Sequence, residues 1–117
     1  MVQRRTARGR LIDIDEAITK IQQFLAGKDF ASFTSDSMLH DAVVRNLEIL
    51  SEASRFLPEE LRALEPEIPW RNIADIGNWL RHGYDILNDG IIWETIQRDI
   101  PVLQSAVSAL LRSMKNP

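Results

Sequence analysis

Apolar residues recur along most of this 117-residue chain at intervals of three or four, the spacing that places them on one face of an α-helix. The first such series starts at Ile14 and ends before Gly27, a residue type that commonly follows the last turn of a helix. We therefore predict a first helix that begins near Ile14. Its inward-facing positions are Ile14, Ala17, Ile18, Ile21 and Leu25.

A second helix is predicted after the polar connection DFASFTSDSM, in which the Ser-Asp-Ser run at 35–37 is suited to accept the free amides of a first turn. The stretch LPEELRALEPEIP then predicts a short helix with Pro58 in its first turn, followed by a turn between Pro66 and Pro69. The inward-facing positions of the second helix are Leu39, Val43, Leu47, Leu50 and residues 54–57.

A third helix is predicted from about Pro69, with an apolar stripe and a polar row on opposite sides. LNDG then interrupts the pattern, and Asp99 with Pro101 predicts the cap and first turn of a last helix. The stripe is Ile73, Ile76, Gly77, Leu80, Tyr84 and Leu87, the polar row is Arg71, Asp75, Asn78 and His82, and the last helix has its seam at Ile96, Ile100, Leu103, Val107, Leu110 and Met114.

No stretch alternates apolar and polar residues with the period of a strand, so these elements predict an all-α fold, an up-and-down four-helix bundle with one or two additional short helices. The absence of cysteine excludes disulfides and Cys-ligated zinc. We also find no signal peptide or membrane-spanning segment in the sequence, and we expect a cytoplasmic protein.

Charge is distributed unevenly along the chain. Residues 1–10 carry four arginines and predict a basic, flexible arm, and residues 11–117 form the single predicted domain. The whole chain has a net charge of −3, so the domain itself is acidic. An acidic domain needs a local cluster of cations to bind a nucleic acid.

The polar row of the third helix is the best candidate for chemistry. Its spacing of four, three and four aligns Arg71, Asp75, Asn78 and His82 on one face. An imidazole can move a proton to or from a ribose hydroxyl, while an arginine can hold the phosphodiester, so such a face could cleave RNA without a metal or other cofactor. The alternative is that His82 only caps the end of its helix. The other histidine, His40, is expected to have a surface or capping role.

Three longer stretches in this order, LHDAVVRNLEILSEAS, PEIPWRNIADIGNWLRHGYD and IIWETIQRDIP, resemble the HepT-like branch of the HEPN superfamily over roughly residues 11–112. The resemblance implies a metal-independent endoribonuclease toxin of a type VII toxin–antitoxin system. It also implies an RNA substrate, a cognate minimal nucleotidyltransferase antitoxin as partner, and a homodimer. Neither DNA nor a membrane is expected as a partner.

The motif of this family is an arginine, four to six residues, a histidine, one residue, and a tyrosine to which the antitoxin can attach AMP. His82 and Tyr84 match the histidine and the tyrosine, whereas the arginine position five before His82 is Gly77. Arg81 or Arg71 could take over its phosphate contact. The resemblance implies His82 as a catalytic residue, retains Asn78, and implies Tyr84 as the AMP acceptor. We add Arg81 to the predicted catalytic residues as the substitute for the missing arginine.

Two interpretations remain open at this stage. Arg45 and Glu52 on the second helix either complete a polar groove beside His82 or form an exposed pair of little energetic value. The replacement at Gly77 also allows a different function, a non-catalytic HEPN module that binds a nucleotidyltransferase or a nucleotide.

Gly77 itself predicts a close approach of a neighbouring helix or a second subunit, because glycine within a helix costs about 1 kcal/mol relative to alanine. Trp70, Trp79 and Trp93 are expected in the core or a dimer interface.

Overall fold

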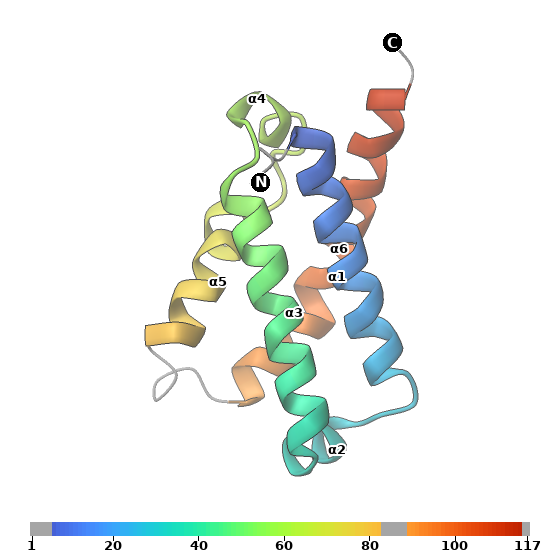
Figure 1. Ribbon diagram of the computed structural model, residues 1–117, viewed down its shortest axis with the longest axis vertical. Helices are drawn as coiled ribbons and strands as arrows, with labels where there is room; N and C mark the ends of the chain where they lie inside the picture. The colour runs from blue at the N-terminus through green and yellow to red at the C-terminus, as the bar shows by residue number, and fades with distance from the viewer. Residues whose placement is uncertain (1–5, 83–88, 116–117) are drawn as a thin grey trace, which may run out of the picture.

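The computed structural model describes residues 6–82 and 89–115, and the regular elements in these ranges are α-helices. Four long helices run alternately up and down, as Figure 1 shows. The predicted all-α bundle with additional short helices is therefore confirmed. The long helices are α1 (Ala7–Leu25), α3 (Ser37–Arg55), α5 (Trp70–His82) and α6 (Asp89–Lys115), and the short ones are α2 (Phe30–Ser35) and α4 (Glu59–Arg62).

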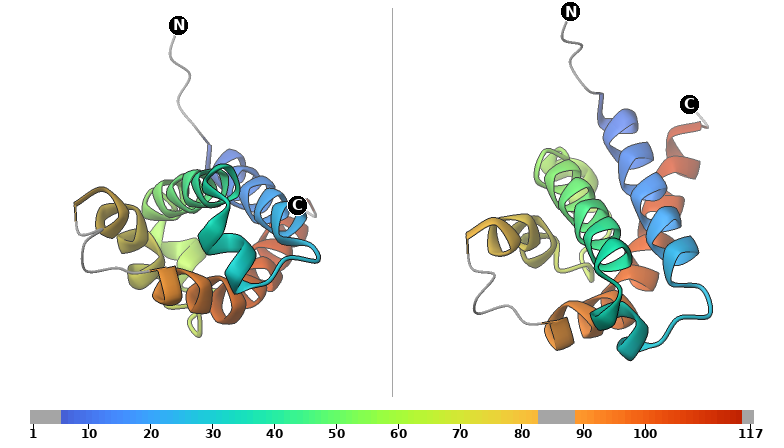
Figure 2. Two further views of the ribbon diagram at one scale, coloured as in Figure 1. Left: turned by 90° about the horizontal axis from the view of Figure 1, so that it is seen from below. Right: turned by 60° about the horizontal axis from the view of Figure 1, so that its bottom comes forward.

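Helix α3 occupies the central position, with α1 packed on one side and α5 on the other, while α6 packs on α1. Figure 2 shows the helices surrounding a common core. Most of the predicted inward-facing positions of α1 and α3 are buried in it, Ile14, Ile18 and Leu50 completely. Leu39 is only partly buried, and Arg55 and Phe56, in the range 54–57 that was predicted to face inward, are exposed. Within the described ranges, no helix combines the length and the apolar character needed to cross a membrane.

Side-chain caps explain where the N-terminal helices begin. The Thr6 hydroxyl accepts a hydrogen bond from the Gly9 amide at 2.9 Å, so α1 starts at Ala7 and includes the last four residues of the range predicted as an arm. Asp36 caps α3 in the same way, as the sequence predicted. The connection before it contains the six-residue helix α2, which the sequence did not predict and which Asp29 caps.

The structure agrees with the predicted end of the first helix and the predicted start of the third. Two positions of the third helix's apolar stripe are not described. Gly27 follows α1 with a φ of 73°, a left-handed conformation that favours glycine. Helix α5 begins at Trp70, directly after Pro69. Tyr84 and Leu87, the last two positions of the predicted stripe, lie outside the described residues.

The prediction that Asp99 and Pro101 start the last helix was wrong. Helix α6 begins at Asp89 and continues through Pro101. Proline lacks an amide hydrogen and crowds the carbonyl one turn earlier, so it bends a helix that continues through it. Figure 2 shows that the two parts of α6 run in different directions. Ile96, Ile100 and Leu103 are buried on both sides of the proline, and this packing stabilises the continuous helix.

Candidate functional site

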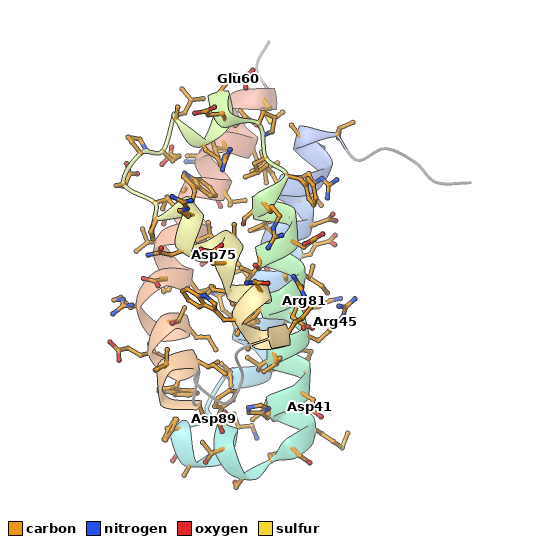
Figure 3. The ribbon with its side chains drawn as sticks, turned by 90° about the vertical axis from the view of Figure 1, so that its left-hand side faces the viewer. Asp41, Arg45, Glu60, Asp75, Arg81 and Asp89 are labelled. Atoms are coloured by element: carbon orange, nitrogen blue, oxygen red, sulfur yellow. The ribbon has the colours of Figure 1, made fainter. Side chains whose placement is uncertain are left out.

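A groove of about 480 Å³ lies between α1, α3 and the end of α5. It brings together three of the predicted site residues, Arg45, Glu52 and Arg81. Figure 3 shows Arg81, near the end of α5, beside Arg45 of α3. Four arginines and three acidic residues line the groove, together with two apolar residues. The lining residues are Arg10, Asp13, Arg45, Glu48, Ile49, Glu52, Ala53, Arg55 and Arg81.

Helix α3 contributes four charged residues because they share one face. Arg45, Glu48, Glu52 and Arg55 are spaced by three, four and three. The Arg45 guanidinium lies 3.8 Å from the Glu48 carboxylate, and the Arg45 side chain remains 70% exposed. Sequence reasoning selected only Arg45 and Glu52, although the same spacing also pointed to the other two.

Helix α1 brings two further residues to the groove that were not predicted, Arg10 and Asp13. Arg10 reaches it because the Thr6 cap extends α1 toward the N-terminus. Its guanidinium lies 4.7 Å from the centre of the Phe56 ring, just beyond the end of α3. This cation–π contact fixes the arginine at one end of the groove.

Gly77 allows α5 to approach α3 closely, as predicted. The Ser51 hydroxyl of α3 donates a hydrogen bond to the Ala74 carbonyl and accepts one from the Gly77 amide, each at 2.8 Å. A Cβ atom at Gly77 would lie 3.0 Å from this hydroxyl oxygen, closer than nearly all such contacts. The Arg55 side chain adds a second hydrogen bond to the Ala74 carbonyl, at 3.1 Å. Small side chains and shared hydrogen bonds therefore hold α5 against α3.

The space above Gly77 is used by Arg81, one helical turn further along α5. The Nη1 atom of Arg81 lies 3.3 Å from the position that a Cβ would take at Gly77. The guanidinium therefore folds back over the glycine, next to Ser51. Arg81 forms no ion pair or side-chain hydrogen bond with any residue in 6–82 or 89–115. Its donors are free to bind an anion in the groove.

The other predicted residues of α5 lie outside this groove. Arg71 lines a separate shallow depression with Arg62 and Trp70. It is ten residues from Arg81, which corresponds to about 15 Å along the helix. Asn78 is exposed and does not line the groove.

The histidine and the tyrosine of the family motif lie at the end of α5 and two residues after it in the sequence. His82 is the last residue of α5, directly after Arg81, and its side chain is not among those described. Tyr84 lies outside the described residues. The backbone nevertheless places His82 one turn from Asn78, on the side of α5 expected from the polar row.

His40 is not the surface or capping residue that the sequence suggested. Its side chain is 15% exposed, and its Nε2 atom lies 2.8 Å from a carboxylate oxygen of Asp89, the first residue of α6. The imidazole also packs against the Phe33 ring at 4.9 Å between centres. His40 therefore joins α3 to α6 and does not line the groove.

The three tryptophans occupy different environments. Trp70 is 8% exposed, and its indole nitrogen donates to the carbonyls of Arg62 and Glu65. Trp93 is partly buried against Phe33, with ring centres 5.6 Å apart. Trp79 remains 42% exposed on α5. The expected core positions of Trp70 and Trp93 agree with the structure, whereas Trp79 presents an apolar surface to solvent.

Burial and a neighbouring carboxylate change the ionisation of one group in the segment between α4 and α5. The pKa of Glu65 is raised, first because burial disfavours its charged form and then because Glu67 hydrogen-bonds to it and repels its charge. This segment lies away from the groove.

The groove is suited to bind a phosphodiester. Its four guanidinium groups exceed its three carboxylates, although the chain as a whole carries a net charge of −3. Guanidinium groups bind phosphate through paired hydrogen bonds as well as through charge. In the described part of the chain, no three His, Asp or Glu side chains form a group able to hold a metal ion.

Comparisons with known proteins identify relatives over most of the chain. The family described as "Ribonuclease HepT-like" matches residues 14–110. A protein of Thermococcus cleftensis named "Probable ribonuclease HepT" is 37% identical over 107 residues, which cover 92% of this chain and 97% of that protein. A protein of Caldanaerobacter subterraneus subsp. tengcongensis named as a "Putative RNase" is 42% identical over 89 residues, 76% of this chain and 80% of that protein. No solved structure gave a significant match.

Proposed function

Because the chain belongs to the HepT-like ribonuclease family, we propose that it is a metal-independent endoribonuclease that binds RNA in the groove between α1, α3 and α5. The observation that carries this proposal is the position of Arg81. Its guanidinium folds over Gly77 and faces the groove without a partner among the described residues. The relatives named as RNases support the same class of activity.

Arg81 takes the place of the motif arginine that is missing at position 77. An arginine side chain starting at position 77 would meet the Ser51 hydroxyl, because even a Cβ there lies 3.0 Å from it. Arg81 instead enters the same space from one turn later. Arg71 is the weaker candidate, since it lines a different depression.

His82 supplies proton transfer in this proposal. An imidazole titrates near neutral pH and can protonate the leaving 5′ oxygen of the cleaved bond. Arg81 binds the phosphate and stabilises the negative charge that develops on it in the transition state. Asn78, one turn before His82, hydrogen-bonds the phosphate or orients the imidazole. Arg45 holds the RNA backbone beside the scissile bond.

The family resemblance also extends the proposal to regulation. A minimal nucleotidyltransferase antitoxin transfers AMP to the Tyr84 hydroxyl, two residues after His82. The added phosphate brings negative charge and bulk close to His82 in the sequence and would therefore exclude RNA by repulsion and steric hindrance. In this scheme the protein is the toxin of a type VII toxin–antitoxin pair.

We further propose that the protein acts as a homodimer. Helix α5 packs chiefly against α3, and Trp79 on α5 keeps 42% of its surface exposed. Large aromatic side chains of this kind are enriched in protein interfaces. A second copy that covers Trp79 would bring two α5 helices, and therefore two Arg81–His82 pairs, near each other.

A second candidate function follows from Gly77. If Arg81 does not replace the motif arginine, the fold is a non-catalytic module that binds the nucleotidyltransferase or a nucleotide in the same groove. Both functions use the groove arginines, but only the nuclease requires His82 for turnover.

Cleavage of RNA in the presence of EDTA tests the proposal. We expect the wild type to cut, His82→Ala to be inactive, and Arg81→Ala to lose about 100-fold or more in rate, as for other groups that stabilise transition-state charge. Arg112→Ala, on the exposed end of α6, removes the same charge elsewhere and serves as the control. Binding of RNA without cleavage by the wild type would favour the non-catalytic module. Growth arrest on expression of the wild type, relieved by His82→Ala, would link the activity to toxicity.

A further inference from the structure

The groove has a second end, away from Arg81, where the start of α1 lies at the same end of the bundle as the end of α3 (Figure 1). Arg10 of α1 lines the groove there, and its guanidinium lies 4.7 Å from the centre of the Phe56 ring. We call these two side chains the Arg10–Phe56 pair. Arg55, directly before Phe56, is ten residues from Arg45, which corresponds to about 15 Å along α3. The pair is therefore well separated from Arg45 and Arg81.

Core packing does not account for the aromatic ring at position 56. The Phe56 side chain is 53% exposed, whereas the next residue, Leu57, is 3% exposed and belongs to the core. The chain thus buries one apolar side chain at the end of α3 and keeps an aromatic ring at the surface beside the groove. Proteins that bind single-stranded nucleic acids combine a positively charged groove with exposed aromatic rings on which bases stack.

Arg10 keeps its hydrogen-bond donors available while it lies over the ring. In 6–82 and 89–115, its side chain forms no ion pair or hydrogen bond with another residue. A guanidinium is planar, so one side can contact an aromatic ring while the other stacks on a base and the edge binds a phosphate. The Arg10–Phe56 pair therefore offers a stacking surface and phosphate donors at one place, which are the contacts that one nucleotide can use.

We propose that the Arg10–Phe56 pair is a subsite for one unpaired base of the RNA, an inference that rests on the RNA binding in the groove proposed above. The base stacks on the exposed surface of the pair. A base in a duplex is already stacked and paired, so the subsite selects single-stranded RNA. Because the pair lies about 15 Å along α3 from Arg45, it binds a nucleotide that flanks the cleaved bond. Arg10 and Phe56 position the substrate and take no part in proton transfer.

Fluorescence anisotropy with a short labelled single-stranded RNA tests the subsite. The parent protein and every variant carry His82→Ala, so that the RNA stays intact. We expect Phe56→Leu, which keeps apolar bulk but removes the aromatic face, to raise the Kd by about 5-fold to 150-fold, the contribution of one stacked base. Phe56→Trp should bind at least as tightly as the parent. Phe24→Leu makes the same change at an exposed ring of α1 outside the groove lining and should leave the Kd unaltered.

RNAs with single abasic sites show whether the ring acts through a base. One abasic position should weaken binding to the parent protein as much as Phe56→Leu does. At that position the two changes together should cost no more than either alone, because both remove the same contact. Phe56→Leu should also leave the slope of log Kd against log salt unchanged, since no phosphate contact is lost.

Cleavage kinetics provide an independent measurement in proteins that retain His82. A flanking subsite binds the substrate and the transition state equally, so Phe56→Leu should raise KM and leave kcat unchanged. A fall in kcat with an unchanged KM would overturn the role as a subsite.

The binding results separate the subsite from the function of the groove. RNA binding by the parent protein with an unchanged Kd in Phe56→Leu would refute the subsite and leave the groove as the RNA site. Additive losses from Phe56→Leu and from each abasic position would refute it as well, since the ring would then act on the fold and not on a base. No RNA binding by the parent protein would refute the function of the groove and with it the subsite.

Discussion

Replacing Gly77 with alanine perturbs the contact that places Arg81 in the groove. The new Cβ would lie 3.0 Å from the Ser51 hydroxyl oxygen and 3.3 Å from Nη1 of Arg81. Ser51 is 1% exposed and is hydrogen-bonded on both sides, to the Ala74 carbonyl and the Gly77 amide, so it cannot move without losing these bonds. The strain therefore falls on the packing of α5 against α3.

The magnitude follows from opposing terms. Overpacking a close contact costs about 1 to 3 kcal/mol, and the weakened Ser51 hydrogen bonds add about 1 kcal/mol. Alanine in place of glycine within a helix gains about 1 kcal/mol. We expect Gly77→Ala to lower the free energy of unfolding by about 1 to 3 kcal/mol in total.

The assay is a double-mutant cycle with Ser51→Ala, measured by urea unfolding and far-ultraviolet circular dichroism at one protein concentration. Without the Ser51 hydroxyl, the nearest Ser51 atom to the new methyl group is Cβ at 3.4 Å, an ordinary contact. Gly77→Ala should then stabilise the Ser51→Ala protein by about 1 kcal/mol, the helix gain alone. Ser54→Ala is the matched control, because the Ser54 hydroxyl bonds the Leu50 carbonyl within α3.

Additive effects of Gly77→Ala and Ser51→Ala on the free energy of unfolding would refute the role of their contact. If Gly77→Ala changed the unfolding free energy equally in the wild type and in Ser51→Ala, within about 0.5 kcal/mol, the contact with Ser51 would not explain the glycine. We also expect Gly77→Ala to weaken RNA binding, because the methyl group displaces the Arg81 guanidinium.

Two further predictions concern charge. Arg45→Ala should reduce the slope of log Kd against log salt for single-stranded RNA by about 0.7, as one lost phosphate contact predicts, whereas Arg71→Ala should leave the slope unchanged; fluorescence anisotropy at several KCl concentrations measures both. Glu65→Gln should raise the urea midpoint at pH 7 but not at about pH 4. The reason is that a raised folded-state pKa favours the protonated form of Glu65, so wild-type stability falls as the pH rises through that value. Equal effects at both pH values would contradict the second prediction.

The helices could be predicted from the sequence because their signals are local. Apolar spacing gave the buried faces of α1 and α3, and Asp36 marked the start of α3. The predicted start of the last helix was wrong because Asp99 and Pro101 form a pattern that is also typical of a first helical turn. Tertiary packing favours a helix that continues through Pro101 over one that starts there, since the apolar residues on either side of the proline share one core.

The groove was only partly predictable because it combines residues from three distant segments. Arg45 and Glu52 were found from their spacing, whereas Arg10 was assigned to an arm. Nothing local in the sequence shows that Arg81 folds back over Gly77, because this depends on how closely α3 approaches α5. The sequence alone could identify the missing motif arginine but not which residue occupies its space.

The bend at Pro101 divides α6 into two units that can open separately. Residue 101 has no amide hydrogen to bond the Gln97 carbonyl, so the ladder of backbone hydrogen bonds has a gap there. The part after the gap lies along α1, where Gln104 exchanges side-chain hydrogen bonds with Gln22. The part before it is attached through Asp89 to His40. Local unfolding that begins at Asp89 can therefore stop at Pro101, and we expect amide hydrogens before the proline to exchange with solvent faster than those after it.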